Sequence, residues 1–342
     1  MKVNLISDTV TRPTQGMLDA MMNATVGDDV FKNDPSVIAL EEKVADYFGM
    51  EASLFFPSGT MTNQSAIKVH TQPGEQLICD KYAHVYNYEG GGVSFNSGVS
   101  CKLVDGHRGM MTAAQVESAI NPPDFYHSPL TTLVCIENTT NKGGGACWDF
   151  EELKAIRNVC ENHGLKYHLD GARLWNALVA KKEDPKSYGK LFDSISVCLS
   201  KGLGCPVGSV LVGSQETIDK ALRVRKVLGG GMRQSGYLAA AGIYALENHV
   251  ARLSEDHEKA KELGNTLANL SVVKKVEPQE TNILIFELDE NQISETVFLN
   301  RLSEKEISLI GMGQGKLRMV THLDYSDEMH QYLLEQLVKL FG

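Results

Sequence analysis

Three apolar, strand-like runs in the sequence are each followed at once by a side chain that can take part in chemistry: Ser58, Asp170 and Lys201. In an open parallel sheet the ligand binds beyond the carboxyl ends of the strands, so residues in such positions gather around one site. A hydroxyl group, a carboxylate and an amine at one sheet edge could bind a phosphate, support a positive charge and bond covalently to a carbonyl carbon.

The first of these segments is Ser58-Gly59-Thr60, which lies between a strand-like run and a predicted helix. The first backbone N–H groups of that helix, with the two hydroxyl groups, could cradle a phosphate. The alternative is that Ser58 or Thr60 is only an N-cap.

The second segment places Asp170 at the end of a strand, where an ionised carboxylate needs a cationic partner. A helix cap or an ion pair with Arg173 is the alternative interpretation of that carboxylate.

Lys201 ends the third run and is followed by Gly202 and Gly204, which allow a ligand to approach the backbone closely. Burial of a charged amine costs free energy unless the amine is used in a covalent bond. Lysine side chains more commonly avoid this cost by extending to solvent. The combination of phosphate cradle, carboxylate and lysine matches pyridoxal 5'-phosphate. Asp170 would hold the pyridinium nitrogen, and Lys201 would form the Schiff base with the aldehyde.

Apolar runs alternate with helix-length periodic segments through the first two-thirds of the chain, which predicts an α/β protein with a mainly parallel sheet sandwiched by helices. The helix predicted over Pro35–Phe48 has Asp34 as its N-cap and Gly49 as its stop. We expect further strands at Ala52–Phe56, Gln76–Cys79, Thr132–Ile136, Lys166–Leu169, Ser194–Leu199 and Ser209–Val212, and helices at Met61–Val69, Ala113–Ile120, Phe150–His163 and Gln215–Val227.

The segment Ser235–Leu270 reads as a long, nearly uninterrupted helical stretch that begins apolar and becomes charged. After it come a predicted strand, helix, strand and helix, at Asn282–Leu288, Ser294–Leu302, Lys316–Val320 and Asp327–Leu340. We therefore expect a large ligand-binding domain at residues 1–245 and a smaller α+β domain at 246–342. The N-terminal arm, residues 1–16, is expected to pack on the small domain or on a partner subunit.

Composition excludes several classes of protein. The formal charge is −10, which disfavours binding to nucleic acid or to an anionic membrane. The longest apolar run, Gly236–Leu246, is well short of the ~18 residues of a spanning helix, and the N-terminus lacks a secretory apolar core. The seven cysteines include no C-x-x-C pair and fit reduced thiols. We predict a cytoplasmic location.

Longer motifs carry a family resemblance. The chain resembles the low-specificity L-threonine aldolases, within the β-eliminating lyase branch of the aspartate-aminotransferase-like (fold type I) pyridoxal enzymes. The resemblance runs along almost the whole chain. Its motifs are Ser7-Asp8-Thr9-Val10-Thr11-Arg12-Pro13, Val26-Gly27-Asp28-Asp29-Val30, His168-Leu169-Asp170-Gly171-Ala172-Arg173, Leu199-Ser200-Lys201-Gly202-Leu203-Gly204, Gly229-Gly230-Gly231-Met232-Arg233-Gln234-Ser235-Gly236 and Val320-Thr321-His322-Leu323-Asp324.

The resemblance implies catalytic roles for Lys201, Asp170 and His84, with the His84 ring stacked on the pyridine ring. It implies a homodimer or homotetramer in which Arg233 reaches the phosphate of the neighbouring subunit; a hinge with a solvated arginine is the alternative. No metal ligands are expected. The cofactor-binding residues implied are Ser58, Gly59, Thr60, His84, Asp170, Arg173, Ser200, Lys201 and Arg233.

The same resemblance implies that the substrate carboxylate binds to Ser7, Arg173 and Arg318. A surface ion pair is the alternative for Arg318. His168 could orient Asp170. Thr140 departs from the family pattern: Glu137-Asn138-Thr139-Thr140-Asn141 stands where relatives show Glu-Asn-Thr-His-Asn, so Thr140 replaces an aromatic base near the substrate side chain. This leaves open the preferred β-substituent, the threo or erythro preference at Cβ and the dominant reaction.

The activity expected is reversible retro-aldol cleavage of L-threonine, L-allo-threonine or a related L-β-hydroxy-α-amino acid to glycine and an aldehyde. His84, or a water that it positions, would act as the base. The alternatives are a β-eliminating lyase, an aminotransferase acting on a small amino acid, and a non-catalytic pyridoxal-binding protein.

Overall fold

The central element of the computed structural model, which describes all residues 1–342, is a seven-stranded sheet in the order β2-β8-β7-β6-β5-β3-β4. All neighbouring strands are parallel except those on either side of β8, which runs antiparallel to both β2 and β7. The strands are β2 (Ala52–Phe56), β3 (Gln76–Asp80), β4 (Ser100–Val104), β5 (Thr131–Glu137), β6 (Lys166–Gly171), β7 (Ser194–Cys198) and β8 (Ser209–Gly213).

Helices cover both faces of this sheet because alternate strand residues point to opposite sides. Phe55 belongs to the larger core cluster, with residues of α2 and α6, whereas Leu54 and Phe56 pack with residues of α3 and α9. The helices of this part are α1 (Gln15–Met22), α2 (Pro35–Phe48), α3 (Gly59–His70), α4 (His84–Asn87), α5 (Ala113–Ala119), α6 (Phe150–His163), α7 (Leu174–Lys181), α8 (Pro185–Gly189), α9 (Gln215–Val227) and α10 (Gly236–Asn248). The prediction of a parallel sheet between helices is confirmed.

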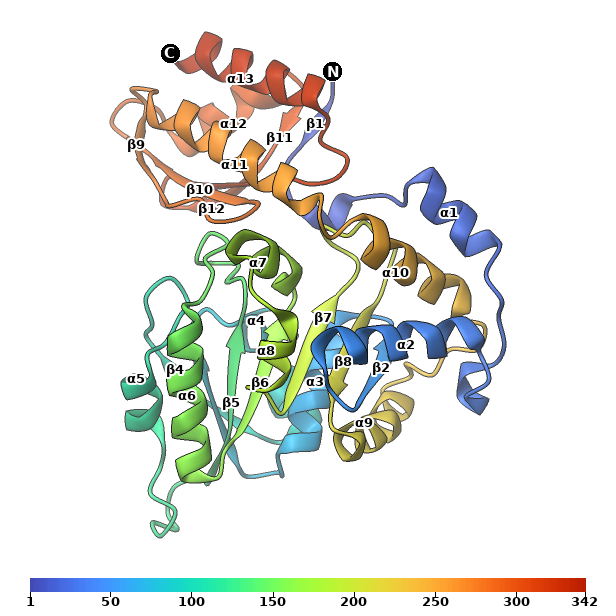
Figure 1. Cartoon of the computed structure of the whole chain (residues 1–342). Coiled ribbons are helices and arrows are strands. Elements are labelled where there is room, and N and C mark those ends of the chain that lie inside the picture. Colours follow the sequence, from blue (N-terminus) through green and yellow to red (C-terminus); the bar gives the residue numbers. More distant parts are fainter.

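A smaller unit lies above the sheet in Figure 1 and has its own apolar core. Its antiparallel sheet has the order β12-β13-β10-β9. Strand β1 (Val3–Asn4), at the N-terminus, pairs in parallel with β11, so the arm lies against this unit. The elements are α11 (Leu253–Ala268), β9 (Val273–Val276), β10 (Ile283–Leu288), α12 (Glu295–Ser303), β11 (Ile307–Ser308), β12 (Ile310–Gly313), β13 (Lys316–Val320) and α13 (Asp327–Phe341).

The expected long helix over Ser235–Leu270 is wrong in one respect, because it is two helices, α10 and α11, joined by a turn at residues 249–252. The imidazole Nδ1 of His249 lies 2.7 Å from the carbonyl oxygen of Leu203 in the loop after Lys201. This contact holds the turn against the large domain.

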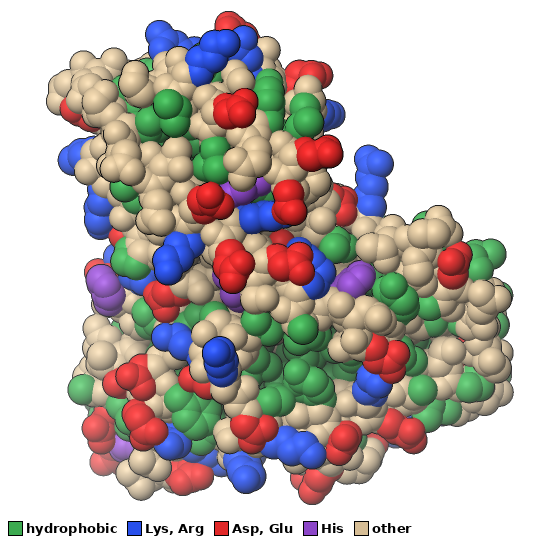
Figure 2. All heavy atoms as spheres, turned by 45° about the horizontal axis from the view of Figure 1, so that its top comes forward, with side chains coloured by type: hydrophobic (Ala, Val, Ile, Leu, Met, Phe, Trp, Pro, Cys, Tyr) green, Lys and Arg blue, Asp and Glu red, His purple; other side chains and the backbone are tan.

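The molecular surface carries charges of both signs. On the face shown in Figure 2, Lys and Arg side chains are interspersed with Asp and Glu side chains and do not form a continuous patch of one sign. No helix combines the length and the apolar character needed to cross a bilayer.

Candidate active site

A cavity of about 260 Å³ lies at the carboxyl ends of the parallel strands and brings together most of the predicted residues. Of the residues named from the sequence, its walls include Ser58, Gly59, Thr60, His84, Asp170, Ser200 and Lys201. The wall also includes Asn63, Glu89, Cys198, Pro206 and Val207, together with Pro57 and Ala172.

The N-terminus of α3 forms one end of the cavity. Ser58 is the N-cap, and its hydroxyl oxygen accepts a hydrogen bond from the Met61 N–H at 3.2 Å. The first-turn N–H groups of a helix have no intrahelical partners and attract anions. A Cβ atom added at Gly59 would lie 2.6 Å from the Cys198 sulfur, so glycine at this position lets the first turn of α3 pack closely against the end of β7. The N-cap interpretation and the phosphate cradle are therefore compatible.

Asp170 lies at the end of β6 and is 2% exposed. Its Oδ1 accepts from the Ala172 N–H at 3.1 Å, whereas Oδ2 is buried without any hydrogen-bond partner. A buried carboxylate oxygen without a hydrogen-bond donor costs free energy. A bound group that donates a hydrogen bond to this oxygen would remove that cost. The pyridinium N–H of pyridoxal 5'-phosphate is such a donor. The alternative ion pair with Arg173 is absent because that guanidinium binds Asp8.

Lys201 follows β7 and extends into the same cavity. Its Nζ lies 3.4 Å from the Cys198 sulfur and makes no ion pair within 4.0 Å. The backbone oxygen of Lys201 accepts from the Thr11 hydroxyl at 3.0 Å, which ties the N-terminal arm to this loop. An amine that is neither paired nor fully solvated is free to bond to a carbonyl carbon.

His84 begins the short helix α4 and lies between carboxylates. Its Nδ1 is 2.9 Å from Glu89 Oε1, and its backbone N–H donates to Glu137 Oε2 at 2.9 Å. One ligand atom from each of His84, Glu89 and Asp170 lies within 4.8 Å of the other two. Burial lowers the pKa of His84, but the hydrogen bond to Glu89 and the surrounding carboxylates outweigh burial, so the pKa is raised.

Glu137, at the end of β5, is not in the cavity wall but binds the backbone of His84 from behind it, a role that the sequence motif does not predict. Burial, and then the charge of Asp170, raise the pKa of Glu137 to about 7. Its Oε1 accepts from the Asn141 N–H at 2.7 Å, so it joins the His84 segment to the loop after β5. The sequence held a signal, because Glu137 ends a strand-like run as Asp170 does. Glu89, in a loop after α4, carries no such signal.

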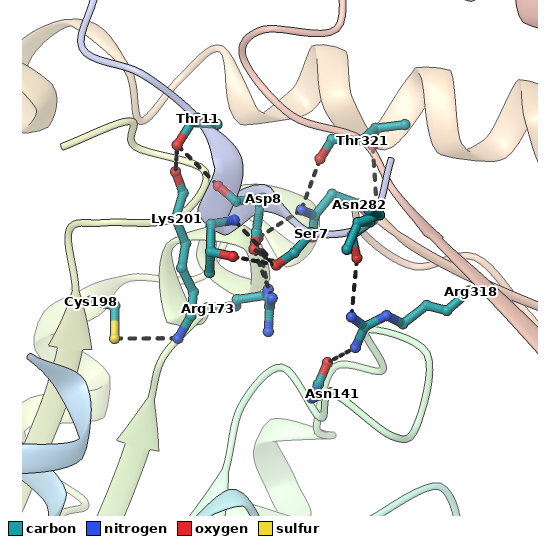
Figure 3. A network of polar contacts seen from close by, with 12 residues as sticks. Ser7, Asp8, Thr11, Asn141, Arg173, Cys198, Lys201, Asn282, Arg318 and Thr321 are labelled. Carbon is teal, nitrogen blue, oxygen red and sulfur yellow. Dashed lines mark hydrogen bonds and ion pairs between the residues drawn. The ribbon is translucent and has the colours of Figure 1, made fainter. Parts of the chain in front are cut away.

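Arg173 is buried and forms a bidentate ion pair with Asp8 (Figure 3). Its Nε and Nη2 donate to the two carboxylate oxygens at 2.8 and 2.7 Å, which leaves Nη1 outside this pair. Burial alone raises the pKa of Asp8, but the Arg173 charge and hydrogen bonds, together with the Lys201 charge, lower it to about 2. Ser7 lies beside this pair, with its hydroxyl 3.5 Å from Asp8 Oδ1.

Arg318 reaches the same region from β13 in the small unit (Figure 3). Its Nη1 donates to Asn141 Oδ1 at 2.9 Å and its Nη2 to the Ile6 carbonyl at 3.2 Å, while Nε is buried and without a partner. Burial, and then the charge of Arg173, lower the pKa of Arg318. The surface ion pair considered from the sequence is not formed. Two guanidinium groups without a shared anion between them suit a carboxylate.

Three predicted residues lie elsewhere. Arg233 is 57% exposed at its side chain and pairs with Asp28 at 2.9 Å, outside the cavity. Thr140 is 3% exposed and lines a different, small cavity, with its Cγ2 3.3 Å from where a Gly109 Cβ would lie. His168 does not orient Asp170, because its ring nitrogens face Ser194 and Asn63.

Comparison with known proteins agrees with this geometry. A family model described as beta-eliminating lyase matches residues 4–291. Low-specificity L-threonine aldolase 1 of Arabidopsis thaliana is 43% identical over 327 residues, covering 94% of this chain and 91% of that protein. Low specificity L-threonine aldolase of Escherichia coli strain K12 is 42% identical, and 95% of each chain is covered.

Among solved structures, Leishmania major threonine aldolase superposes with a TM-score of 0.85 at 21% identity, over 99% of this chain and 100% of that one. This likeness confirms the predicted fold. The length and level of the sequence matches identify the family: the chain belongs to the β-eliminating lyases and, among them, to the low-specificity L-threonine aldolases.

Proposed function

We propose that this protein uses pyridoxal 5'-phosphate to cleave L-threonine, L-allo-threonine and related L-β-hydroxy-α-amino acids reversibly into glycine and an aldehyde. The observation that carries the proposal is the buried, unpartnered Oδ2 of Asp170 in the cavity that also contains the unpaired amine of Lys201. A group with a cationic ring N–H and an electrophilic carbon would satisfy both.

The residues fit this cofactor. Asp170 would accept the ring N–H, Lys201 would form the Schiff base, and the first turn of α3 from Ser58 to Thr60 would hold the phosphate. Ser200 and His84 complete the wall. When bound, pyridoxal 5'-phosphate supplies an electron sink for the electrons of the bond that breaks at Cα.

The substrate carboxylate would bind between Arg318 and the Nη1 group of Arg173, with the Ser7 hydroxyl beside them. Asp8 occupies the other face of Arg173 and holds its plane. A substrate whose carboxylate binds two guanidinium groups cannot turn freely in the site. Its Cα–Cβ bond is therefore held in one orientation. That orientation selects the bond that breaks.

His84, or a water molecule that it positions, would take the proton of the β-hydroxyl group. The Cα–Cβ bond then breaks, the aldehyde leaves, and a proton adds at Cα to complete glycine. Hydrogen bonds at Nδ1 and at the backbone N–H hold His84 in place for this step.

Membership of the threonine aldolases favours this activity over β-elimination, transamination and cofactor binding without catalysis. The deciding experiment incubates purified protein with L-threonine, L-allo-threonine, L-serine and L-cysteine and measures glycine, aldehyde and 2-oxo acids. Glycine and an aldehyde in equal amounts support the proposal. Ammonia with pyruvate from L-serine or L-cysteine, or with 2-oxobutyrate from the threonines, would establish the β-eliminating alternative, and a pyridoxamine form produced by an amino acid alone would establish an aminotransferase.

We also propose a cytoplasmic homodimer or homotetramer with a domain division between residues 245 and 246. All seven cysteines are free, which suits a reducing compartment. The exposed Arg233 lies outside its own cavity, as a residue that serves the phosphate of a neighbouring subunit would.

A further inference from the structure

Glu89 is a fully buried carboxylate that three side-chain donors approach. Its Oε1 accepts from Asn63 Nδ2 at 2.9 Å and lies 2.9 Å from His84 Nδ1, and its Oε2 accepts from Gln64 Nε2 at 2.6 Å. Its side chain has no exposed surface, whereas that of His84 is 33% exposed to the cavity side. In the proposed function Glu89 helps to hold His84 in place, but it has no stated part in the proton transfer.

The loop that holds Glu89 is shaped around this contact. Gly92 packs on the amide of Gln64, and a Cβ atom at this glycine would lie 2.6 Å from the amide carbon and oxygen. Gly90 and Gly91 have φ of +63° and +74°, a region that favours glycine. The triple-glycine run therefore allows the chain to turn directly after Glu89 while Gln64 reaches its carboxylate.

The hydrogen-bond geometry determines where the imidazole proton lies. An ionised carboxyl group only accepts hydrogen bonds, so the nitrogen that contacts it must carry a hydrogen. In neutral His84 that nitrogen is Nδ1, and Nε2 alone keeps a lone pair that can take a proton. The same arrangement of a carboxylate behind an imidazole fixes tautomer and ring orientation in other enzymes.

We propose that Glu89 is a positioning residue for the aldol cleavage: it holds the His84 hydrogen on Nδ1 and thereby presents Nε2 as the proton acceptor for the β-hydroxyl group. This inference rests on the proposed function, in which His84 or its water is the base. Asn63 and Gln64, on α3, hold the carboxylate in its place.

Other titratable groups also face His84. They are Asp170 from β6, Glu137 from β5 and Tyr88 from the end of α4, whose ring centroid is 5.6 Å from the imidazole. Only Glu89 contacts a ring nitrogen. Burial lowers the pKa of His84, and the hydrogen bond to Glu89 is the largest effect that raises it. Loss of this carboxylate should therefore lower the pKa of His84 and weaken it as a base.

The test exchanges the carboxylate of Glu89 with the amide of Gln64, so that every hydrogen bond between the two positions can still form. In the double variant Q64E/E89Q, the amide oxygen introduced at position 89 can accept from Asn63 and His84, and its NH₂ group can donate to the new carboxylate at position 64. Asn96 Nδ2, which now donates to the Gln64 side-chain oxygen, keeps an acceptor. Packing and composition are unchanged, but the charge no longer touches the imidazole.

Two measurements are made on the holoenzyme. Carbon-13 and nitrogen-15 NMR of labelled histidine, with the His84 signals assigned from His84→Asn, reports the tautomer and the pKa of His84 without turnover. The pH profile of kcat/KM for L-threonine reports the pKa of the group that acts as the base during turnover. The charge-matched control is E304Q, an exposed acid in the small unit.

We expect the Nδ1–H tautomer in the wild-type protein. For E89Q we expect the His84 pKa and the acidic limb of kcat/KM to move down by about one pH unit, and the plateau to fall roughly tenfold. In the double variant, the His84 pKa and the acidic limb should move in the same direction by a smaller amount. In E304Q, neither the pKa nor the limb should move. A wild-type Nε2–H tautomer, or a His84 pKa and pH limb unchanged in both variants, would overturn the inference.

Failure of the inference is distinct from failure of the proposed function. If the wild-type protein releases no glycine from any β-hydroxy amino acid, the proposed function fails, and the tautomer and pKa measurements still decide whether Glu89 controls His84. If glycine is released normally but the variants leave the profile unchanged, only the role of Glu89 is refuted.

Discussion

Asp8 and Arg173 form a buried bidentate ion pair that joins the N-terminal arm to the large domain, with donor–acceptor distances of 2.8 and 2.7 Å. The Asn282 amide of the small unit also donates to Asp8, at 3.1 Å. Three parts of the chain therefore meet at one carboxylate. The position of Arg173, and with it the proposed carboxylate site, depends on how these parts pack together.

Replacement of Asp8 by Asn should impair substrate binding more than turnover. Arg173 would lose the charge and one of the two carboxylate oxygens that hold its plane, so we expect KM for L-threonine to rise about tenfold while kcat falls less. Steady-state kinetics of D8N measure the split, with the exposed loop substitution D124N as control. An unchanged KM would show that Asp8 does not position the carboxylate site.

Asp8 should also make folding stability depend on pH. Its pKa is about 2 in the folded protein and near 4 in an unfolded chain. A depressed carboxyl pKa stabilises the folded state above about pH 4, and this stabilisation is lost as the pH falls from 4 towards 2. Thermal unfolding should show D8N less stable than wild type by about 2 kcal/mol at pH 7, with the gap closing near pH 2. A gap that is constant with pH would contradict the assignment.

A methyl group at Gly59 should weaken cofactor binding because it would collide with the Cys198 sulfur, 2.6 Å away. We expect G59A to raise the dissociation constant for pyridoxal 5'-phosphate by ten- to a hundredfold, measured by titration of the apoprotein. The double variant G59A/C198A removes the sulfur and should recover most of the affinity, with C198A alone as the matched control. Equal losses in both variants would mean that the collision is not the cause.

Arg233 should act on the cofactor of a neighbouring subunit. Co-expressed K201A and R233A chains would form mixed oligomers in which one site combines an intact Lys201 with an intact Arg233 from the other chain. We expect activity well above that of either variant alone, in a species larger than a monomer by sedimentation. No complementation, or a fully active monomer, would remove the intersubunit role.

The sequence allowed prediction of the site wherever function is tied to a local pattern. Ser58, Asp170 and Lys201 all lie at or just after the end of a strand. The helices over Pro35–Phe48 and Phe150–His163 have the predicted ends because their caps are encoded locally. The edge strand β4 was missed because Ser100–Val104 is largely exposed and lacks a continuous apolar run.

The parts that sequence reasoning missed depend on tertiary contacts. Glu89 acquires its role only when the turn after α4 packs on α3, and Asp8 only when the arm crosses to Arg173. Asn141 meets Arg318 across 177 positions of sequence. Thr140, in contrast, was expected near the substrate from its place in a motif, but the turn of its loop directs it into a separate cavity.

The assignment of Lys201 as the lysine that binds the cofactor can be tested directly. The holoenzyme is treated with borohydride, digested and analysed by mass spectrometry, with K201A treated in parallel. We predict a single pyridoxyl-modified peptide that contains Lys201, and loss of both the modification and glycine release in K201A. A modified peptide from another lysine, or a K201A protein that keeps the visible cofactor band and its turnover, would contradict it.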